Sequence, residues 1–146
     1  MAIRDNPYGE FNFLVQLGDG SDDTVAGGFR TVSGIGTSLD VIEYRNGNDR
    51  SPSTRLLAGL RRHPRAVLTR GVIGDLRLWQ WANQDPPERR TVTIVLLDET
   101  RSAVMAFTLL RAWPTKWEGP ALDAAGTDVA IETLELCYEG LQVESI

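Results

Sequence analysis

The sequence is short of the residue types that build most covalent, metal and catalytic sites. Its 146 residues include one cysteine, Cys137, and one histidine, His63. A single cysteine excludes an intrachain disulfide, and one histidine with one cysteine cannot supply the nitrogen and sulfur ligands of a zinc site. We therefore expect no bound metal and no cofactor.

Long hydrophobic runs are also missing. The longest apolar stretches, residues 94–97 and 103–107, are far too short to cross a bilayer. The first residues contain no apolar segment of the kind found in secretory signals. These absences predict a soluble protein, made in a reducing compartment and without a direct lipid anchor.

Lysine is almost absent, and the basic residues are unevenly placed. Fourteen of the fifteen basic residues are arginine, and twenty acidic residues bring the net charge to −5, which disfavours general binding to DNA, RNA or anionic membranes. Residues 45–70 hold seven arginines and one acid, Asp49, whereas the rest of the chain holds eight basic and nineteen acidic residues. Arginine pairs with carboxylates at two points, which suits interfaces, although genome composition produces the same bias.

The length and composition are those of one ordinary globular domain. Hydrophobic residues make up 42% of the chain and charged residues 24%, and 146 residues leave little room for a second domain. We predict a single domain over residues 1–146.

Alternating hydrophobic residues dominate the rest of the pattern and predict β-strands. In residues 91–97, for example, Val92, Ile94 and Leu96 share one side, and the threonines take the other. Asp75 is placed to cap a short helix over residues 76–83. The fold predicted is a mainly antiparallel β-sandwich or barrel with one short flanking helix. The predicted strands are residues 11–17, 25–32, 39–44, 65–72, 91–97, 103–112 and 129–138.

Two stretches depart from simple alternation. In the last predicted strand, Val129 and Ile131 take odd positions, but Leu134 and Leu136 take even ones. A β-bulge between these pairs, or burial on both faces, would account for the change. Residues 45–54 are polar and rich in turn formers, and we predict a long loop, a feature that is usually functional or disordered in compact domains.

Residues with catalytic potential are few and poorly placed. His63 lies in a basic turn, and a hydrolase that uses it is one alternative. Gly34 and Gly36 are followed by a strand, so they do not form a phosphate-binding loop, which requires a helix there. Trp113 and Trp117 flank a proline in a predicted turn, and a small ligand-binding module that uses them is a second alternative. The sequence therefore argues against an enzyme.

Motifs spread along almost the whole chain resemble the inner-tube proteins of contractile phage tails and of phage-tail-like contractile injection systems. The order and spacing of these short motifs are more specific than any one of them. The matching stretches are residues 6–13, 41–45, 68–72, 78–81, 96–99, 112–120 and 129–136.

The resemblance implies a β-barrel subunit that forms hexameric rings, which stack into a rigid tube. Head-to-tail contacts that close laterally give rings, and contacts that do not close give filaments. The family usually has a different run near residues 51–64, so this chain departs from it in the segment that resembles the loop reaching a neighbouring subunit. We expect a protruding loop at about residues 45–64. The predicted subunit-interface residues are Arg45, Asn48, Asp49, Arg50, Arg55, Arg61 and Arg62.

The resemblance also implies the function and the partners. A sheath around the tube contracts and drives it through a target envelope, and the lumen passes cargo. The expected partners are further copies of the chain, the sheath protein, baseplate or hub and cap proteins, and a cargo or tape-measure protein, with no sequence-specific nucleic acid. The particle would be assembled in the bacterial cytoplasm. A phage-like injection system fits the motifs slightly better than a virion tail that conducts DNA, and the type VI secretion tube fits them less well.

Overall fold

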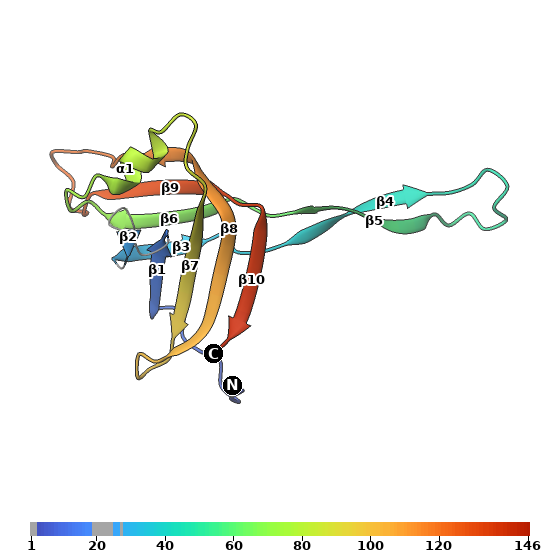
Figure 1. The fold of residues 1–146 in the computed structure, drawn as a ribbon, viewed down its shortest axis with the longest axis horizontal. Coiled ribbons are helices and arrows are strands. Elements are labelled where there is room, and N and C mark those ends of the chain that lie inside the picture. The colour runs from blue at the N-terminus through green and yellow to red at the C-terminus, as the bar shows by residue number, and fades with distance from the viewer. Residues whose placement is uncertain (1–2, 19–24, 27) are drawn as a thin grey trace.

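The chain folds into a body of two β-sheets, from which a long two-stranded hairpin projects (Figure 1). The computed structural model describes residues 3–18, 25–26 and 28–146. Its elements are β1 (Phe13–Leu17), β2 (Val25–Ala26), β3 (Phe29–Ser33), β4 (Ser38–Tyr44), β5 (Arg55–Arg62), β6 (Ala66–Gly71), α1 (Arg77–Ala82), β7 (Arg90–Leu97), β8 (Ala103–Glu118), β9 (Ile131–Cys137) and β10 (Gly140–Ser145).

All strand pairs are antiparallel, and one long strand, β8, belongs to both sheets of the body. The first sheet has the order β2–β1–β7–β8–β10, and the second has the order β8–β9–β6–β3. Between its two halves lies Arg111, whose φ of 53° is in the left-handed region. In Figure 1 the strands of the two sheets cross steeply, as expected where a strand changes sheet at a bend.

The facing sides of the two sheets form one hydrophobic core. Leu17 and Val92 from the first sheet belong to the same cluster as Leu68 and Leu134 from the second, and all four are fully buried. Burying such a side chain contributes roughly 1.5–3 kcal/mol. The core therefore confirms the mainly antiparallel β fold that the alternation predicts.

A buried ion pair explains the irregular alternation in β9. Strands β6 and β9 pair from Ile131 to Leu136 without a register shift, so the predicted bulge is wrong. Glu132 occupies a core position on the same face as Leu134, and it accepts a hydrogen bond of 2.5 Å from Arg70 Nε. The hydrophobic pattern is interrupted because a charged residue takes a core position, while the odd-numbered residues of β9 are half-buried.

The helix is where the sequence places it, but it begins one residue later and ends one residue earlier than predicted. Leu78 and Trp81, three positions apart, are buried against the sheets. Leu76 occupies the N-cap position, and Asp75 accepts a hydrogen bond of 3.1 Å from the backbone N–H of Arg77. No helix among the described residues is long and apolar enough to cross a membrane.

Three strand predictions need correction. Residues 25–32 form two strands, β2 and β3, which pair with different sheets. Strand β8 continues to Glu118 rather than ending at residue 112, because its second half pairs with β9 around a register shift next to Pro114, which has no N–H to donate. The sequence analysis also missed β10, which adds an edge strand to the first sheet.

The polar loop predicted over residues 45–54 is confirmed as the tip of a β-hairpin, but residues 55–62, predicted as part of the same protruding loop, form strand β5. Strand β5 pairs with β4 from Tyr44↔Arg55 to Ser38↔Arg62, with one bulge. The eight residues of β5, RLLAGLRR, show no alternation, because neither face of this strand packs on the body. The periodicity that identifies half-buried strands is therefore absent here.

Candidate functional site

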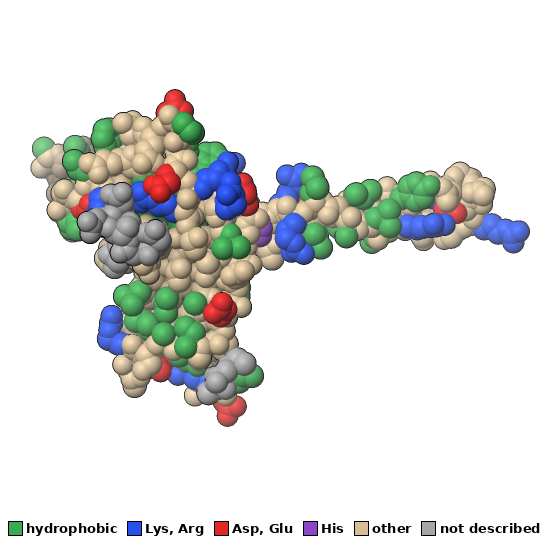
Figure 2. Space-filling model, in the orientation of Figure 1, with side chains coloured by type: hydrophobic (Ala, Val, Ile, Leu, Met, Phe, Trp, Pro, Cys, Tyr) green, Lys and Arg blue, Asp and Glu red, His purple; other side chains and the backbone are tan. Residues whose placement is uncertain are grey.

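The hairpin exposes apolar side chains on both of its faces. We call residues 38–62 the arm and the rest of the described chain the body. Val41 and Leu56 lie on one face of the arm and are 65% and 69% exposed, and Ile42 and Leu57 lie on the other and are about half exposed. Figure 2 shows hydrophobic side chains along the middle of the arm and basic side chains near its root and toward its tip. A two-stranded hairpin without a packed face is marginal in water, so this surface is suited to contact with another protein.

The tip of the arm is organised by its own charged residues. Arg45 donates to the backbone oxygens of Ser51, at 3.0 Å, and Asp49, at 2.8 Å. The Asp49 carboxylate accepts from the N–H of Asn46, at 3.0 Å, and from Arg55, at 3.3 Å. Three of the predicted interface residues, Arg45, Asp49 and Arg55, therefore hold the tip in shape within one subunit.

The remaining predicted interface residues divide between the root and the tip. Near the root, Arg61 donates to Thr37 Oγ1 at 2.9 Å and Arg62 to Asp40 at 2.6 Å. At the tip, the side chains of Asn48 and Arg50 make no hydrogen bond or ion pair with any described residue. All seven predicted residues lie on the arm, and Arg50 is the cation left available for a partner.

The root of the arm is clamped to the body. The hydroxyl of Tyr138 donates to the carbonyl of Gly34 at 2.7 Å and accepts from the N–H of Gly36 at 3.1 Å. Burial raises the pKa of this phenol above its usual value. A Cβ at Gly34, where φ is +82°, would lie 1.9 Å from the carbonyl oxygen of Arg65, so a side chain does not fit there.

His63 belongs to the same clamp. Its Nδ1 lies 3.0 Å from the carbonyl oxygen of Gly36, and its ring lies 5.0 Å from that of Tyr138 between centroids. This geometry ties the strand that leaves the arm to the strand that enters it. The contacts of His63 are those of a structural residue.

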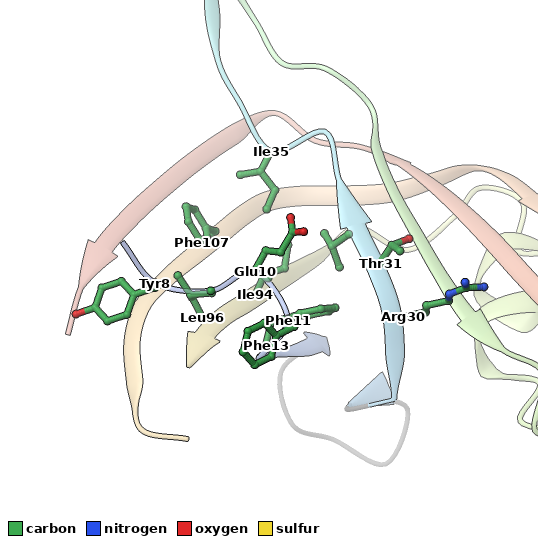
Figure 3. Close-up of a pocket in the computed structure, with 12 residues that line it drawn as sticks. Tyr8, Glu10, Phe11, Phe13, Arg30, Thr31, Ile35, Ile94, Leu96 and Phe107 are labelled. Carbon is green, nitrogen blue, oxygen red and sulfur yellow. The ribbon is translucent and has the colours of Figure 1, made fainter. Parts of the chain in front are cut away.

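Beside the root lies an open groove of about 600 Å³, lined by both polar and apolar side chains (Figure 3). It runs between β3 of the second sheet and β1, β7 and β8 of the first, and the N-terminal segment borders it. Its apolar lining includes Phe11, Phe13, Val32, Ile35, Ile94, Leu96 and Phe107. Sequence reasoning missed this groove, because its lining comes from four separate segments.

Comparison with known proteins assigns the chain to a family. Residues 9–142 match the family model described as T4-like virus tail tube protein gp19. The chain belongs to this tail tube protein family. No curated protein sequence matches it. The resemblance drawn from the short motifs is thereby confirmed.

Solved structures of tube proteins superpose on nearly the whole chain. A chain of the PVC sheath–tube complex, from an extracellular contractile injection system in the extended state, is 26% identical with a TM-score of 0.83, covering 97% of this chain and 94% of that one. A chain of the anti-feeding prophage baseplate is 28% identical with a TM-score of 0.84, covering 97% of each. Hcp1 from Flavobacterium johnsoniae, 13% identical with a TM-score of 0.55 over 91% of this chain and 94% of that one, shares the fold.

The tryptophans of this tube protein are structural rather than paired around a turn. Trp113 and Trp117 lie inside β8, so the predicted turn is wrong. Trp117 Nε1 donates to Glu132 at 3.3 Å, whereas the guanidinium of Arg89 lies 5.5 Å from the Trp113 ring. The two rings therefore have different partners and do not form one ligand platform.

Metal-binding and thiol chemistry find little support in the described part of the tube protein. No group of three or more His, Cys, Asp or Glu residues there is placed to hold a metal ion. Burial raises the pKa of the half-buried Cys137 thiol, which keeps it protonated and unreactive at neutral pH.

Proposed function

We propose that this protein forms the rigid inner tube of a contractile injection particle, as stacked hexameric rings that a contracting sheath drives through a target envelope. The observation that carries the proposal is the near full-length match, in both directions, to chains of an injection-system sheath–tube complex and of a related baseplate. Because the chain aligns with these relatives over nearly their whole length, it contains the segments through which they assemble.

The edges of the first sheet support lateral closure into a ring. β10 forms one edge, and β1 is covered at the other edge only by the two-residue β2 among the described strands. Among the described residues, both edges leave backbone donors and acceptors without a strand partner, a liability that pairing with identical neighbours removes. Such pairing would join the first sheets of all subunits into one closed barrel.

In that barrel, the face of the first sheet that points away from the core would line the channel. This face is almost uncharged, and Glu144 is the single ionisable residue in the two rows that cross its centre. These rows are Gln16–Thr93–Thr108–Gln142 and Leu14–Val95–Ala106–Glu144. A wall without cations would not hold nucleic acid phosphates, and it suits the passage of cargo without binding it.

The arm would supply the contacts between subunits. Arg45, Asn48, Asp49, Arg50, Arg55, Arg61 and Arg62 are proposed as its interface residues, with Arg50 and Asn48 reaching the partner directly. Arg45, Asp49 and Arg55 act mainly by shaping the tip, as their contacts within the arm indicate.

The proposed partners follow from the complexes in which the relatives were solved. They are the sheath protein around the tube, the baseplate or hub at one end and a terminating cap at the other. Cargo or a tape-measure protein would occupy the lumen. We propose assembly in the bacterial cytoplasm, followed by action as part of an extracellular particle.

A virion tail that conducts DNA is the second candidate, favoured by the family model, which describes a virus protein. The genes beside this one separate the two. Capsid and terminase genes would identify a phage, and an ATPase with toxin-like cargo but no capsid genes would identify an injection system.

Negative-stain electron microscopy of the purified protein, with light scattering on the same sample, tests the proposed assembly. Rings or tubes with a central channel are expected. If only monomers appear, the protein is co-expressed with its sheath and baseplate genes. Continued absence of tubes there would contradict the proposal.

A further inference from the structure

An asparagine followed by a glycine lies at the tip of the arm, the end farthest from the body (Figure 1). Asn46 and Gly47 begin a turn that is closed by a hydrogen bond of 3.1 Å from the N–H of Asp49 to the carbonyl oxygen of Asn46. None of the other four asparagines of the chain precedes a glycine. The backbone nitrogen that follows an asparagine can attack its side-chain amide carbon and close a succinimide ring. Glycine hinders this attack least, because it has no side chain and its backbone adopts the widest range of conformations.

The surroundings of Gly47 are open. No atom outside its two chain neighbours lies within 4 Å of the position that a Cβ would take there, and residues 47 and 48 are exposed. The N–H of Gly47 and the side-chain nitrogen of Asn46 make no hydrogen bond with any described residue. The attacking nitrogen and the leaving nitrogen are therefore not held in other contacts within the described chain, and water reaches the turn.

The hydroxyl of Tyr44, the last residue of β4, contacts the amide that would be attacked. It donates a hydrogen bond to Asn46 Oδ1, the oxygen on which negative charge develops when the nitrogen of Gly47 bonds to the amide carbon. A donor that is already aimed at such an oxygen stabilises the transition state. The tip therefore brings together a nucleophile, an electrophile and a donor for the oxyanion within four consecutive residues.

We propose that Asn46 is a site of spontaneous deamidation, with water as the co-reactant. The nitrogen of Gly47 loses its proton to water and bonds to Cγ of Asn46. The bond from Cγ to Nδ2 then breaks, and the leaving nitrogen takes a proton from water and departs as ammonia.

Water then adds to the succinimide and opens it in one of two ways. Cleavage between Cγ and the nitrogen of Gly47 gives aspartate with the normal backbone. Cleavage between the carbonyl carbon of residue 46 and the same nitrogen gives isoaspartate. The overall reaction consumes one water and releases one ammonia, and nothing is oxidised or reduced.

Both products change the charge of the tip, and isoaspartate also changes its shape. Arg45, Arg50 and Arg55 stand against Asp49 as the charged residues of the tip, so a second carboxylate halves its net positive charge. Isoaspartate lengthens the backbone of the turn by a methylene group, and the hydrogen bond that closes the turn is then lost. The reaction therefore alters the segment that holds the predicted interface residues. It goes beyond the proposed tube function and does not rest on it, since every group involved belongs to one arm.

Ageing of the purified, unassembled protein tests the site. The protein is incubated in mildly alkaline buffer, digested at intervals and analysed by mass spectrometry with electron-transfer fragmentation, which separates aspartate from isoaspartate. We expect conversion of Asn46 to both products. Asn48, which lies in the same turn and precedes Asp49, is the internal control and should stay unmodified over the same period. If Asn46 were no more reactive than Asn48, the proposal would be overturned.

Three variants test the chemistry. Tyr44→Phe keeps the ring and removes the hydroxyl, and it should slow conversion about tenfold, equivalent to about 1.4 kcal/mol of activation free energy. Tyr8→Phe, in the N-terminal segment, is the matched control and should age at the wild-type rate. Gly47→Ala fits the open space and should slow conversion several-fold.

These positions lie outside the hydrophobic core, so each variant should fold as the wild type does, which circular dichroism checks. Slower conversion in Tyr44→Phe and Gly47→Ala, with an unchanged Tyr8→Phe, would support the proposal. Wild-type rates in both Tyr44→Phe and Gly47→Ala would overturn it, because neither the donor nor the glycine would then contribute to the reaction.

Discussion

The body and the arm are both antiparallel β-structure, yet apolar side chains are buried in the strands of the body and exposed in the strands of the arm. In β6 and β9, every second residue is buried in the core of the same chain. In β4 and β5, apolar residues occur on both faces, and nearly all are exposed. The core of the body is therefore buried within one chain, whereas the arm has the composition of an element that is buried only in an assembly.

The same contrast holds for charge. The ion pair between Arg70 and Glu132 in the body is almost fully buried, with both side chains under 10% exposed. The pair between Arg62 and Asp40 in the arm is nearly as short, at 2.6 Å, but it is open to water. Burial, rather than distance, decides how much each pair contributes to stability.

The largest effect is expected from reversing charge in the arm. Arg50→Glu with Arg55→Glu should abolish ring stacking and leave the body folded, because these residues lie at the tip, away from the core. Electron microscopy and circular dichroism measure the two properties. The control, Arg65→Glu with Lys116→Glu, makes the same change of net charge on the body. If the arm variant still polymerised normally, the arm would not be the stacking element.

Breaking the buried ion pair of the body should lower the free energy of unfolding more than breaking the exposed ion pair of the arm. Glu132→Ala leaves Arg70 buried without its carboxylate and should lower the free energy of unfolding by about 3–5 kcal/mol. Asp40→Ala should cost less than about 1 kcal/mol. Urea denaturation of the monomer measures both. Equal losses would show that the arm is as well packed as the body.

A matched pair of leucines sharpens the comparison for apolar contacts. Leu68 is fully buried, and Leu56 is 69% exposed. Leu68→Ala should cost about 2–5 kcal/mol of monomer stability, and Leu56→Ala should stay within about 0.5 kcal/mol of the wild type. The effects on tube assembly should have the opposite order. Leu56→Ala should weaken assembly more than Leu68→Ala does, because only Leu56 is exposed to a partner.

The smallest effect concerns acid stability of the body near the helix. Hydrogen bonding to Arg77 lowers the pKa of Asp75 from 3.8 to about 2. Because the folded state favours the ionised carboxylate, its contribution to stability is present above about pH 4 and is lost as the pH falls toward 2. Asp75→Asn and Arg77→Leu should each flatten the fall of unfolding free energy between pH 4 and 2. A wild-type slope in both variants would contradict the assignment.

Sequence reasoning was most successful where one face of an element is buried. Strand β7 and helix α1 follow the predicted residues 91–97 and 76–83 within two residues at each end. It failed where the two faces of a strand do not differ in hydrophobicity as a half-buried strand would. β5 is exposed on both sides, Glu132 brings a charge into the core, and β10 has only Leu141 and Val143 as an alternating signal.

The sequence by itself determined the class of fold, the basic segment at residues 45–70 and, through its motifs, the tube family. Only the tertiary structure decided that this segment is a hairpin, which of its arginines hold the tip and which remain available, and where the groove lies. The physical reason is that alternation records burial within one element. A groove lined by four segments, or an arm whose partner is another molecule, depends on contacts that no single stretch of sequence contains.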